Sequence, residues 1–331
     1  MNEILRPSNL GELIDRTAQL YRTHFLVFFG IAAVPTALIL VVASGVYLFF
    51  ARFGDISNSA IGFIGGMLVI AVALIAVPIY MAATALSSAA LNHSAARALF
   101  NQEITIVDAY KAVWAHGWRY IGLYLLQGLI VAGAPIVAWF AIVSISTVAG
   151  AFLQSSGIPF DIFFAIELLL VLATLAAFCV WMTLRLSLAL PACVIEKLGA
   201  VPALKRSAVL SKGTLGRIFL LYLLGSVLNY LLLIVITFPM LIVTAFIPGA
   251  NSPEHGQAIY TAMAFTAYCA AFAVQALTKP VYGIALVLFY YDQRIRIEGF
   301  DIEWMMLKAG LVVPPQAQIA LASDQETPRP V

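Results

Sequence analysis

The chain has 331 residues, of which 63% are hydrophobic and only 10% are charged, and its formal net charge is +2 at pH 7. A soluble domain carries roughly a quarter charged residues and cannot bury so large an apolar fraction in one core, so the composition excludes a soluble protein and indicates a membrane protein. The small net charge and the lack of a dense basic patch exclude nucleic acid as a partner.

Six apolar stretches along the chain are long enough to cross a bilayer, which takes about 20 residues of helix. The first of them follows a charged segment and has no cleavage site after it, so we expect a first span rather than a removed leader. The predicted fold is therefore all-α, a polytopic membrane protein with six transmembrane helices, at residues 25–50, 62–91, 120–148, 160–191, 218–247 and 258–291.

A short amphipathic helix is predicted directly before each odd-numbered span. The three segments read NLGELIDRTAQLY from Asn9, TIVDAYKAVW from Thr105 and AVPALKRSAVL from Ala200. Asn9 with Glu12, and Thr105 with Asp108, have the spacing of a capped helix start. In the first segment the apolar residues also recur at the helical period along one face.

The order of short helix, span, outer loop and span occurs three times, which predicts a threefold internal repeat. The units cover about residues 8–92, 102–195 and 200–298. Internal repeats often place a site at the axis that relates them, although any helical hairpins with basic connections would resemble one another. We expect one membrane domain, residues 1–311, followed by a disordered cytoplasmic tail, residues 312–331, because the tail is polar and rich in proline.

Lysine and arginine are divided unequally between the two sides of the predicted spans. The N-terminal segment, the second and fourth connections and the C-terminal segment hold sixteen of them, whereas the other three connections hold only Arg52. Positive residues are retained on the cytoplasmic side of a membrane. Both termini and the three short helices are therefore predicted to be cytoplasmic.

The last span ends abruptly in the charged segment YYDQRIRIEGFD, residues 290–301. Tyr290 and Tyr291 suit the headgroup layer of the membrane, and the arginines that follow suit its anionic inner leaflet. We also expect the charges to form a structural network that closes the ring of repeats. Its predicted members are Asp292, Arg294, Arg296, Glu298 and Asp301, which would pair with Asp15 and Arg16 of the first unit. Such pairs fix geometry more than they add stability.

Two segments, LRPSNLGELIDRTAQLYRTHF near the start and YYDQRIRIEGFDIEW near the end, carry a family resemblance. The chain resembles, over about residues 4–308, a family of bacterial multi-span proteins named after the membrane domain of glycerophosphoryl diester phosphodiesterases. The resemblance implies a location in the bacterial cytoplasmic (inner) membrane. It covers the membrane part only, because the chain contains no His-Arg dipeptide of the kind that opens the catalytic domain of those enzymes.

Four candidate site residues fall inside the predicted spans. Arg185 and Lys279 are expected near the cytoplasmic interface, where they either extend to the surface past apolar neighbours or meet a lipid phosphate or small anion at the mouth of a vestibule. The vestibule requires that the short helices pack around the end of the sixth span. The other two, Glu167 and Gln275, are candidate intramembrane polar residues, and Glu167 lies too near the outer surface to pair with either cation.

Three classes of function remain open from the sequence. The leading one is a non-enzymatic scaffold or a protein that handles lipids or small solutes, with membrane lipids as partners and a further cytoplasmic or membrane protein not excluded. The second is a transporter or pore along the repeat axis, lined by hydroxyls such as Ser87 and Ser187. The third is an enzyme acting on lipid headgroups, which we do not favour because no catalytic constellation is visible. No CxxC or HExxH motif occurs, so neither a metal nor a cofactor is predicted.

Overall fold

The computed structural model describes residues 7–53, 59–155, 161–246 and 256–299, together with 302, 305 and 306. The elements of this part of the chain are all helices. In chain order they are α1 (Leu10–Thr23), α2 (Phe25–Phe53), α3 (Ser59–Leu99), α4 (Ile106–Trp114), α5 (Gly117–Gly128), the π-helical turn η1 (Leu129–Gly133), α6 (Ala134–Ser155), α7 (Asp161–Leu186), α8 (Ala189–Ile195), α9 (Ala200–Leu210), α10 (Leu215–Ala245) and α11 (Gly256–Glu298). The predicted roles of Asp301 and of the tail 312–331 lie outside the described residues.

Six helical stretches are long and apolar enough to cross a membrane, namely α2, α3, the continuous run α5–η1–α6, α7, α10 and α11. The predicted all-helical class and the number of candidate spans are thereby confirmed. The fourth stretch, Phe164–Ile195, reaches past the expected end at residue 191, but it is not one continuous helix, because α7 ends at Leu186 and α8 begins at Ala189. The break is held by Leu188, whose backbone N–H donates to Ser207 Oγ at 3.1 Å instead of continuing the helix.

A short helix stands directly before each odd-numbered long stretch: α1 before α2, α4 before α5 and α9 before α10. Both capped starts predicted from the sequence are present. The Glu12 carboxylate accepts from the Asn9 backbone N–H at 3.4 Å, and Thr105 Oγ1 accepts from the Asp108 N–H at 3.1 Å. Each short helix also buries a pair of residues one turn apart on a single face, namely Leu13 and Thr17, Ala109 and Val113, and Ala203 and Ser207. In α9, Leu204 and Leu210 are buried as well.

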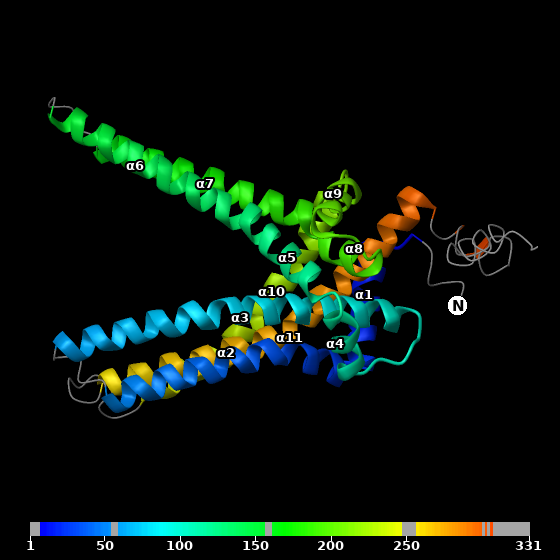
Figure 1. Cartoon of the computed structure of the whole chain (residues 1–331), viewed down its shortest axis with the longest axis horizontal. Helices are drawn as coiled ribbons and strands as arrows, with labels where there is room; N and C mark the ends of the chain where they lie inside the picture. The colour runs from blue at the N-terminus through cyan, green and yellow to red at the C-terminus, as the bar shows by residue number, and fades with distance from the viewer. Residues whose placement is uncertain are drawn as a thin grey trace, which may run out of the picture.

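Figure 1 shows a packed region from which two arms extend. We call this region the head. It consists of α1, α4, α8 and α9, the first turns of α5 and α10, and the last turns of α3 and α11. One arm contains α2, α3, α10 and α11, which contact one another, and the other contains α6 and α7 and points away from the first. The buried core lies mainly in the head, whereas the most apolar stretch of α7 contains no buried residue.

The C-terminal part of α11 is the central element of the head. It contacts α1, α3, α8 and α9, and Phe289, Tyr290 and Gln293 are among its fully buried side chains. The sixth span therefore continues far beyond the thickness of a bilayer because other helices of the protein, rather than lipid, cover its end.

Two prolines inside the long helices each leave one backbone carbonyl without its helical N–H partner. Hydroxyl or thiol groups from other helices donate to these carbonyls instead. Pro35 has no N–H to donate to the carbonyl of Ile31 one turn earlier, and this carbonyl accepts from Ser87 and Tyr110, both at 2.9 Å. Pro135 follows the π-helical turn η1, where the Cys179 thiol donates to a carbonyl at 3.2 Å. These side chains satisfy backbone groups that water cannot reach inside a membrane.

Hydroxyl groups on the three short helices tie each of them to a long helix of another predicted unit. The short helix of the first unit bonds the third unit, that of the second bonds the first, and that of the third bonds the second. The bonds run from Tyr21 in α1 to Leu277 O in α11 at 2.9 Å, from Tyr110 in α4 to Ile31 O in α2 at 2.9 Å, and from Ser207 in α9 to Arg185 O in α7 at 2.9 Å.

Candidate functional site

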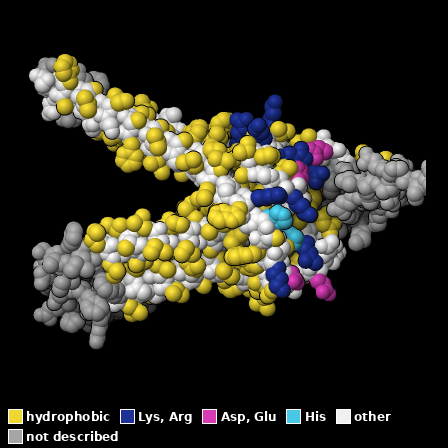
Figure 2. Space-filling model, viewed as in Figure 1, with side chains coloured by type: hydrophobic (Ala, Val, Ile, Leu, Met, Phe, Trp, Pro, Cys, Tyr) yellow, Lys and Arg dark blue, Asp and Glu magenta, His cyan; other side chains and the backbone are white. Residues whose placement is uncertain are grey.

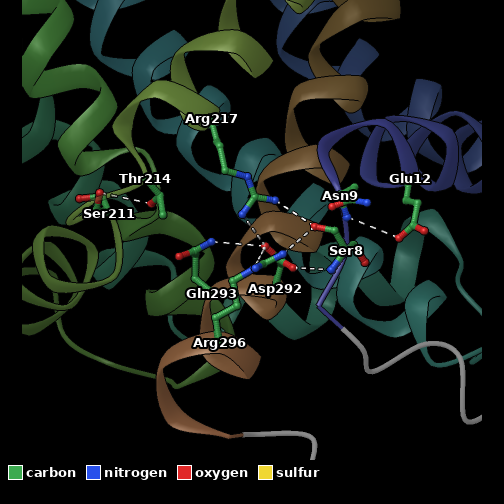
Figure 3. Close-up of polar contacts among 9 residues, drawn as sticks. All are labelled: Ser8, Asn9, Glu12, Ser211, Thr214, Arg217, Asp292, Gln293 and Arg296. Atoms are coloured by element: carbon green, nitrogen blue, oxygen red, sulfur yellow. Dashed lines mark hydrogen bonds and ion pairs between the residues drawn. The ribbon is translucent and has the colours of Figure 1, made fainter.

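Asp292 on α11 is the centre of a polar cluster in the head (Figure 3). Its side chain is only 3% exposed and accepts from the Ser8 N–H at 2.8 Å, from Arg217 at 3.1 Å and from Arg296 at 3.0 Å. Gln293 Nε2 donates to it at 3.3 Å. Both arginines also donate to the Ser8 carbonyl, at 3.0 and 2.9 Å. A buried carboxylate is stable only when it is paired and hydrogen-bonded, and this cluster provides both.

A second charged cluster joins α8, α9 and α11. Arg206 donates to both carboxylate oxygens of Glu196 at 2.9–3.1 Å and lies 2.5 Å from Glu298. Arg294 pairs with Glu298 at 3.2 Å, and the buried hydroxyl of Tyr290 donates to Glu196. The hydrogen bonds with Glu298 and Glu196 hold the pKa of the Arg206 guanidinium above its ordinary value. The two clusters together attach the end of α11 to α1, α8, α9 and α10.

The predicted network of charges is thus assembled around partners that the sequence did not indicate. Its members on α11 contact Ser8, Arg217, Arg206 and Glu196. Asp15 is exposed, because a residue two positions from buried Leu13 lies on the opposite side of a helix with 3.6 residues per turn. Arg16 lines a small cavity beside the cluster together with Ser8 and Asp292.

Some of these contacts are indicated by the sequence and others are not. The i, i+4 spacing of Asp292 with Arg296 and of Arg294 with Glu298 is visible in the sequence and is typical of helical ion pairs. The partners on other helices have no local signal, since Glu196 and Arg206 reach α11 only through the packing of α8 and α9.

The expected place of Tyr290 and Tyr291 in the lipid headgroup layer is wrong. Tyr290 is 0% exposed and Tyr291 is 7% exposed, so both belong to the protein core. Tyr291 packs edge-on against Phe100 with ring centroids 5.6 Å apart. The reason is that the head helices surround this part of α11, so aromatic residues at the end of the apolar run meet protein and not headgroups.

Arg119 and Arg217 occupy the same place in two of the predicted units, the third residue of α5 and of α10. Each donates to a backbone carbonyl just before the next short helix. For Arg119 the acceptor is Lys197 O, ahead of α9, at 3.2 Å, and for Arg217 it is Ser8 O, ahead of α1, at 3.0 Å. The corresponding residue of the first unit is Val27, which has no such donor.

Lys279 lies on α11 next to Pro280 and faces α3. Its ammonium group is 3.5 Å from Thr84 O and 3.4 Å from Ser87 Oγ, both weak contacts with neutral atoms. Thr84 Oγ1 is buried and has no hydrogen-bond partner among the described residues. Within the described part of the chain no carboxylate pairs with Lys279. This place in the bundle therefore holds an ammonium group without an anionic partner and, on Thr84, a hydroxyl without a hydrogen-bond partner.

The other predicted intramembrane residues have separate surroundings. The Arg185 guanidinium lies 5.2 Å from the ring centroid of Trp181 on the same helix, and its neighbours thus differ from those of Lys279. Glu167 accepts a 2.5 Å hydrogen bond from Ser146 and so joins α7 to α6 in the second arm. Gln275 is exposed on α11. The structure therefore does not gather these four residues into one site.

The hydroxyls expected to line a transport route bind backbone carbonyls. Ser87 donates to Ile31 O at 2.9 Å, and Ser187 donates to Leu184 O at 2.8 Å. Such bonds serve to join and cap helices, and they leave these hydroxyls less able to bind a passing solute.

Two larger cavities among the described residues also lie at α1. The first, of about 300 Å³, lies between α1 and the end of α3, and its mixed lining includes the polar residues Arg16, Gln19, His24 and Asn101. The second, of about 280 Å³, is an apolar groove between α1, α10 and α11. Among the described residues no group of three His, Cys, Asp or Glu side chains could hold a metal ion.

The fold and this arrangement of charges define the class of the protein, a helical multi-span membrane protein with a packed polar head. None of three comparisons, with models of protein families, with curated proteins and with solved structures, gives a match for the chain. The resemblance to the phosphodiesterase membrane-domain family therefore stays a prediction based on the two terminal segments.

Proposed function

We propose that this chain is a lipid-handling protein of the bacterial inner membrane that holds an anionic headgroup, or a small anion of the same chemistry, beside Lys279. The head would face the cytoplasm, with both termini on that side. Arg185, the other cation expected to meet such an anion, lies beside Trp181 on α7 and is not part of this site. The observation that carries the proposal is the Lys279 ammonium group, which lies in a helix bundle without an anionic partner among the described residues.

A cation inside a bundle is costly unless an anion or good hydrogen-bond acceptors compensate it. The two acceptors at Lys279 are neutral and distant, and the Thr84 hydroxyl beside it is also unsatisfied. A phosphate oxygen bound here would supply the missing charge and accept the hydroxyl proton. Phosphate is the anionic group that a membrane offers in quantity.

The distribution of charge supports the proposed orientation. Figure 2 shows Lys, Arg, Asp, Glu and His side chains gathered over the head, whereas the arms present mainly hydrophobic side chains on this face. Apolar arms suit the hydrocarbon, and a head rich in Lys and Arg suits the cytoplasmic surface.

The threefold repeat is supported by two sets of contacts that run from unit to unit. The first set consists of the hydroxyl bonds of the short helices, which join unit one to unit three, unit two to unit one and unit three to unit two. The second set consists of the arginines at the third residue of α5 and of α10, each of which donates to a carbonyl just before the short helix of the next unit. Hairpins that merely look alike have no reason to exchange contacts in this cyclic order. We therefore propose that the units are copies and that the contacts at Ser8 close the ring.

Binding of three soluble probes to the purified full-length protein tests the proposed site. The probes are inorganic phosphate, glycerol phosphate and dihexanoyl phosphatidylglycerol, each titrated in detergent. We expect saturable binding that the Lys279→Met variant weakens by about tenfold, as the loss of one charge-assisted contact implies. Lys111→Met is the matched control, because Lys111 is exposed on α4.

The three probes separate the sources of the anion. Tight binding of phosphatidylglycerol alone identifies a lipid headgroup, whereas equal binding of all three identifies a small anion. Binding that is the same in wild type and Lys279→Met, or no saturable binding of any probe, rejects the proposed site and leaves the scaffold interpretation.

A further inference from the structure

The apolar groove between α1, α10 and α11 is separate from the surroundings of Lys279. It has a volume of about 280 Å³, and its lining includes Ile14, Ala18 and Leu286. On α10 it reaches Leu224 and Leu228, which are 48% and 37% exposed and belong to an apolar span. The groove therefore begins at the head and opens along a surface that faces lipid.

The floor of the groove depends on a close approach between two helices. Gly225 on α10 lies against the ring of Tyr282 on α11, and a Cβ atom at this glycine would lie 2.5 Å from that ring. The absence of a side chain at residue 225 thus lets the Tyr282 ring approach α10 closely. Tyr222 packs beside it, with ring centroids 5.8 Å apart.

Most polar groups along the groove are already satisfied within the protein. Thr17 donates to Leu13 O at 2.7 Å, Tyr21 donates to Leu277 O at 2.9 Å, and the Tyr282 hydroxyl lies 3.3 Å from Ser226 Oγ. A sugar or nucleotide needs several polar partners along its length, and most of this lining is apolar. The surface instead suits a flexible hydrocarbon chain.

Two polar groups of the groove have no partner among the described residues, and they suit the polar end of a lipid. Arg22 is exposed in the last turn of α1 and lines the groove. A guanidinium group binds phosphate through parallel hydrogen bonds. The Tyr222 hydroxyl is a further donor on the same lining.

We propose that this groove holds one acyl chain of an anionic phospholipid, with Arg22 bound to its phosphate. The apolar lining, the opening toward lipid and the exposed guanidinium group on the same lining agree on this occupant. A helix of a partner protein would bury the same apolar surface but would not need an arginine on the lining. This site does not depend on the anion proposed at Lys279.

Photolabelling of the full-length protein in phosphatidylcholine nanodiscs tests the proposal. The probe is phosphatidylglycerol with a diazirine in one acyl chain, compared with the same probe on phosphatidylcholine. We expect label on peptides of α1, α10 and α11 that line the groove, with the anionic probe preferred by about tenfold. Arg22→Gln should abolish this preference, and Arg22→Lys, which keeps the charge, should restore most of it.

Two further variants make the outcome decisive. Ala18→Phe places a ring at the rim of the groove and should reduce labelling by both probes without changing the melting temperature. Lys111→Gln, an exposed cation on α4, should change nothing. Equal labelling by the two probes, labelling unaffected by Arg22→Gln and Ala18→Phe, or a cross-link to a co-purified polypeptide in place of lipid would overturn the proposal. Because Lys279→Met leaves this labelling unchanged if the proposal holds, the two lipid sites succeed or fail separately.

Discussion

Arg217 and Asp292 form a 3.1 Å ion pair between the third residue of α10 and the C-terminal part of α11. Both residues also bind Ser8, since Asp292 accepts its N–H at 2.8 Å and Arg217 donates to its carbonyl at 3.0 Å. Ser8 leads directly into α1. One buried carboxylate therefore ties the start of the described chain to its last two long helices.

Replacing Asp292 by alanine should destabilise the head. The change removes the carboxylate that two guanidinium groups and the Ser8 N–H share, and it leaves the guanidinium groups with the Ser8 carbonyl but no anionic partner in this cluster. Breaking a fully buried pair costs about 3–5 kcal/mol. Because Arg217 and Arg296 are 28% and 37% exposed and water screens them, we expect about 2–3 kcal/mol. Reversible unfolding of the protein in mixed detergent micelles measures the free energy of unfolding.

The matched control for this prediction is Asp15→Asn. Asp15 is an exposed carboxylate on α1, so its loss should change the free energy of unfolding by less than about 0.5 kcal/mol. Equal effects of the two substitutions would show that the Asp292 cluster does not stabilise the head.

The carbonyl of Ile31 gives a second prediction. Tyr110→Phe and Ser87→Ala each remove one of its two donors, and each should cost about 1 kcal/mol. The double variant should cost more than the sum, because the carbonyl freed by Pro35 then has no donor in the membrane. Adding Pro35→Ala to the double variant supplies a backbone N–H and should recover part of the loss. A double variant that is simply additive, with no rescue, would argue against this account of the kink.

Alkaline pH should weaken the attachment of α4. Burial raises the pKa of the Tyr110 phenol above its ordinary value of 10.0. Since its pKa is higher in the folded state than in the unfolded state, its contribution is full below pH 10.0 and is lost as the pH rises through the folded-state pKa. Tyr110→Phe should therefore flatten the fall of melting temperature above this pH. An unchanged pH profile in this variant would contradict the prediction.

The proposed orientation is tested with reporters fused to the full chain. A fluorescent protein at the C-terminus should be fluorescent, and alkaline phosphatase at the same place should be inactive, because the first matures in the cytoplasm and the second outside it. Phosphatase inserted between α6 and α7 should be active. The reverse pattern would place the head outside the cytoplasm.

The spans and short helices could be predicted from the sequence because their signals are local. Apolar length defines the six spans, and the spacing of Asn9 with Glu12 and of Thr105 with Asp108 defines two helix starts that the structure contains. The end of α7 at Leu186 could not be predicted, because the apolar run continues while the chain turns to bond Ser207, a residue of another helix.

The contacts of the head were less predictable because they depend on how distant segments pack. Asp292 and Arg296 carry a helical pair spacing, but nothing local indicates that Ser8 and Arg217 complete the cluster. Tyr290 was assigned to the headgroup layer by a rule that holds for helices that end in lipid. It does not apply to α11, whose end is surrounded by protein.

The most direct test of the central claim is native mass spectrometry of the protein extracted gently from its own membrane. Wild type should retain phosphate-bearing lipids or small phosphate esters, and Lys279→Met should carry one such ligand fewer, while Lys111→Met carries as many as wild type. Wild type that carries no such ligand, or an equal number of ligands in wild type and Lys279→Met, would contradict the claim that the unpaired ammonium group of Lys279 is a binding site.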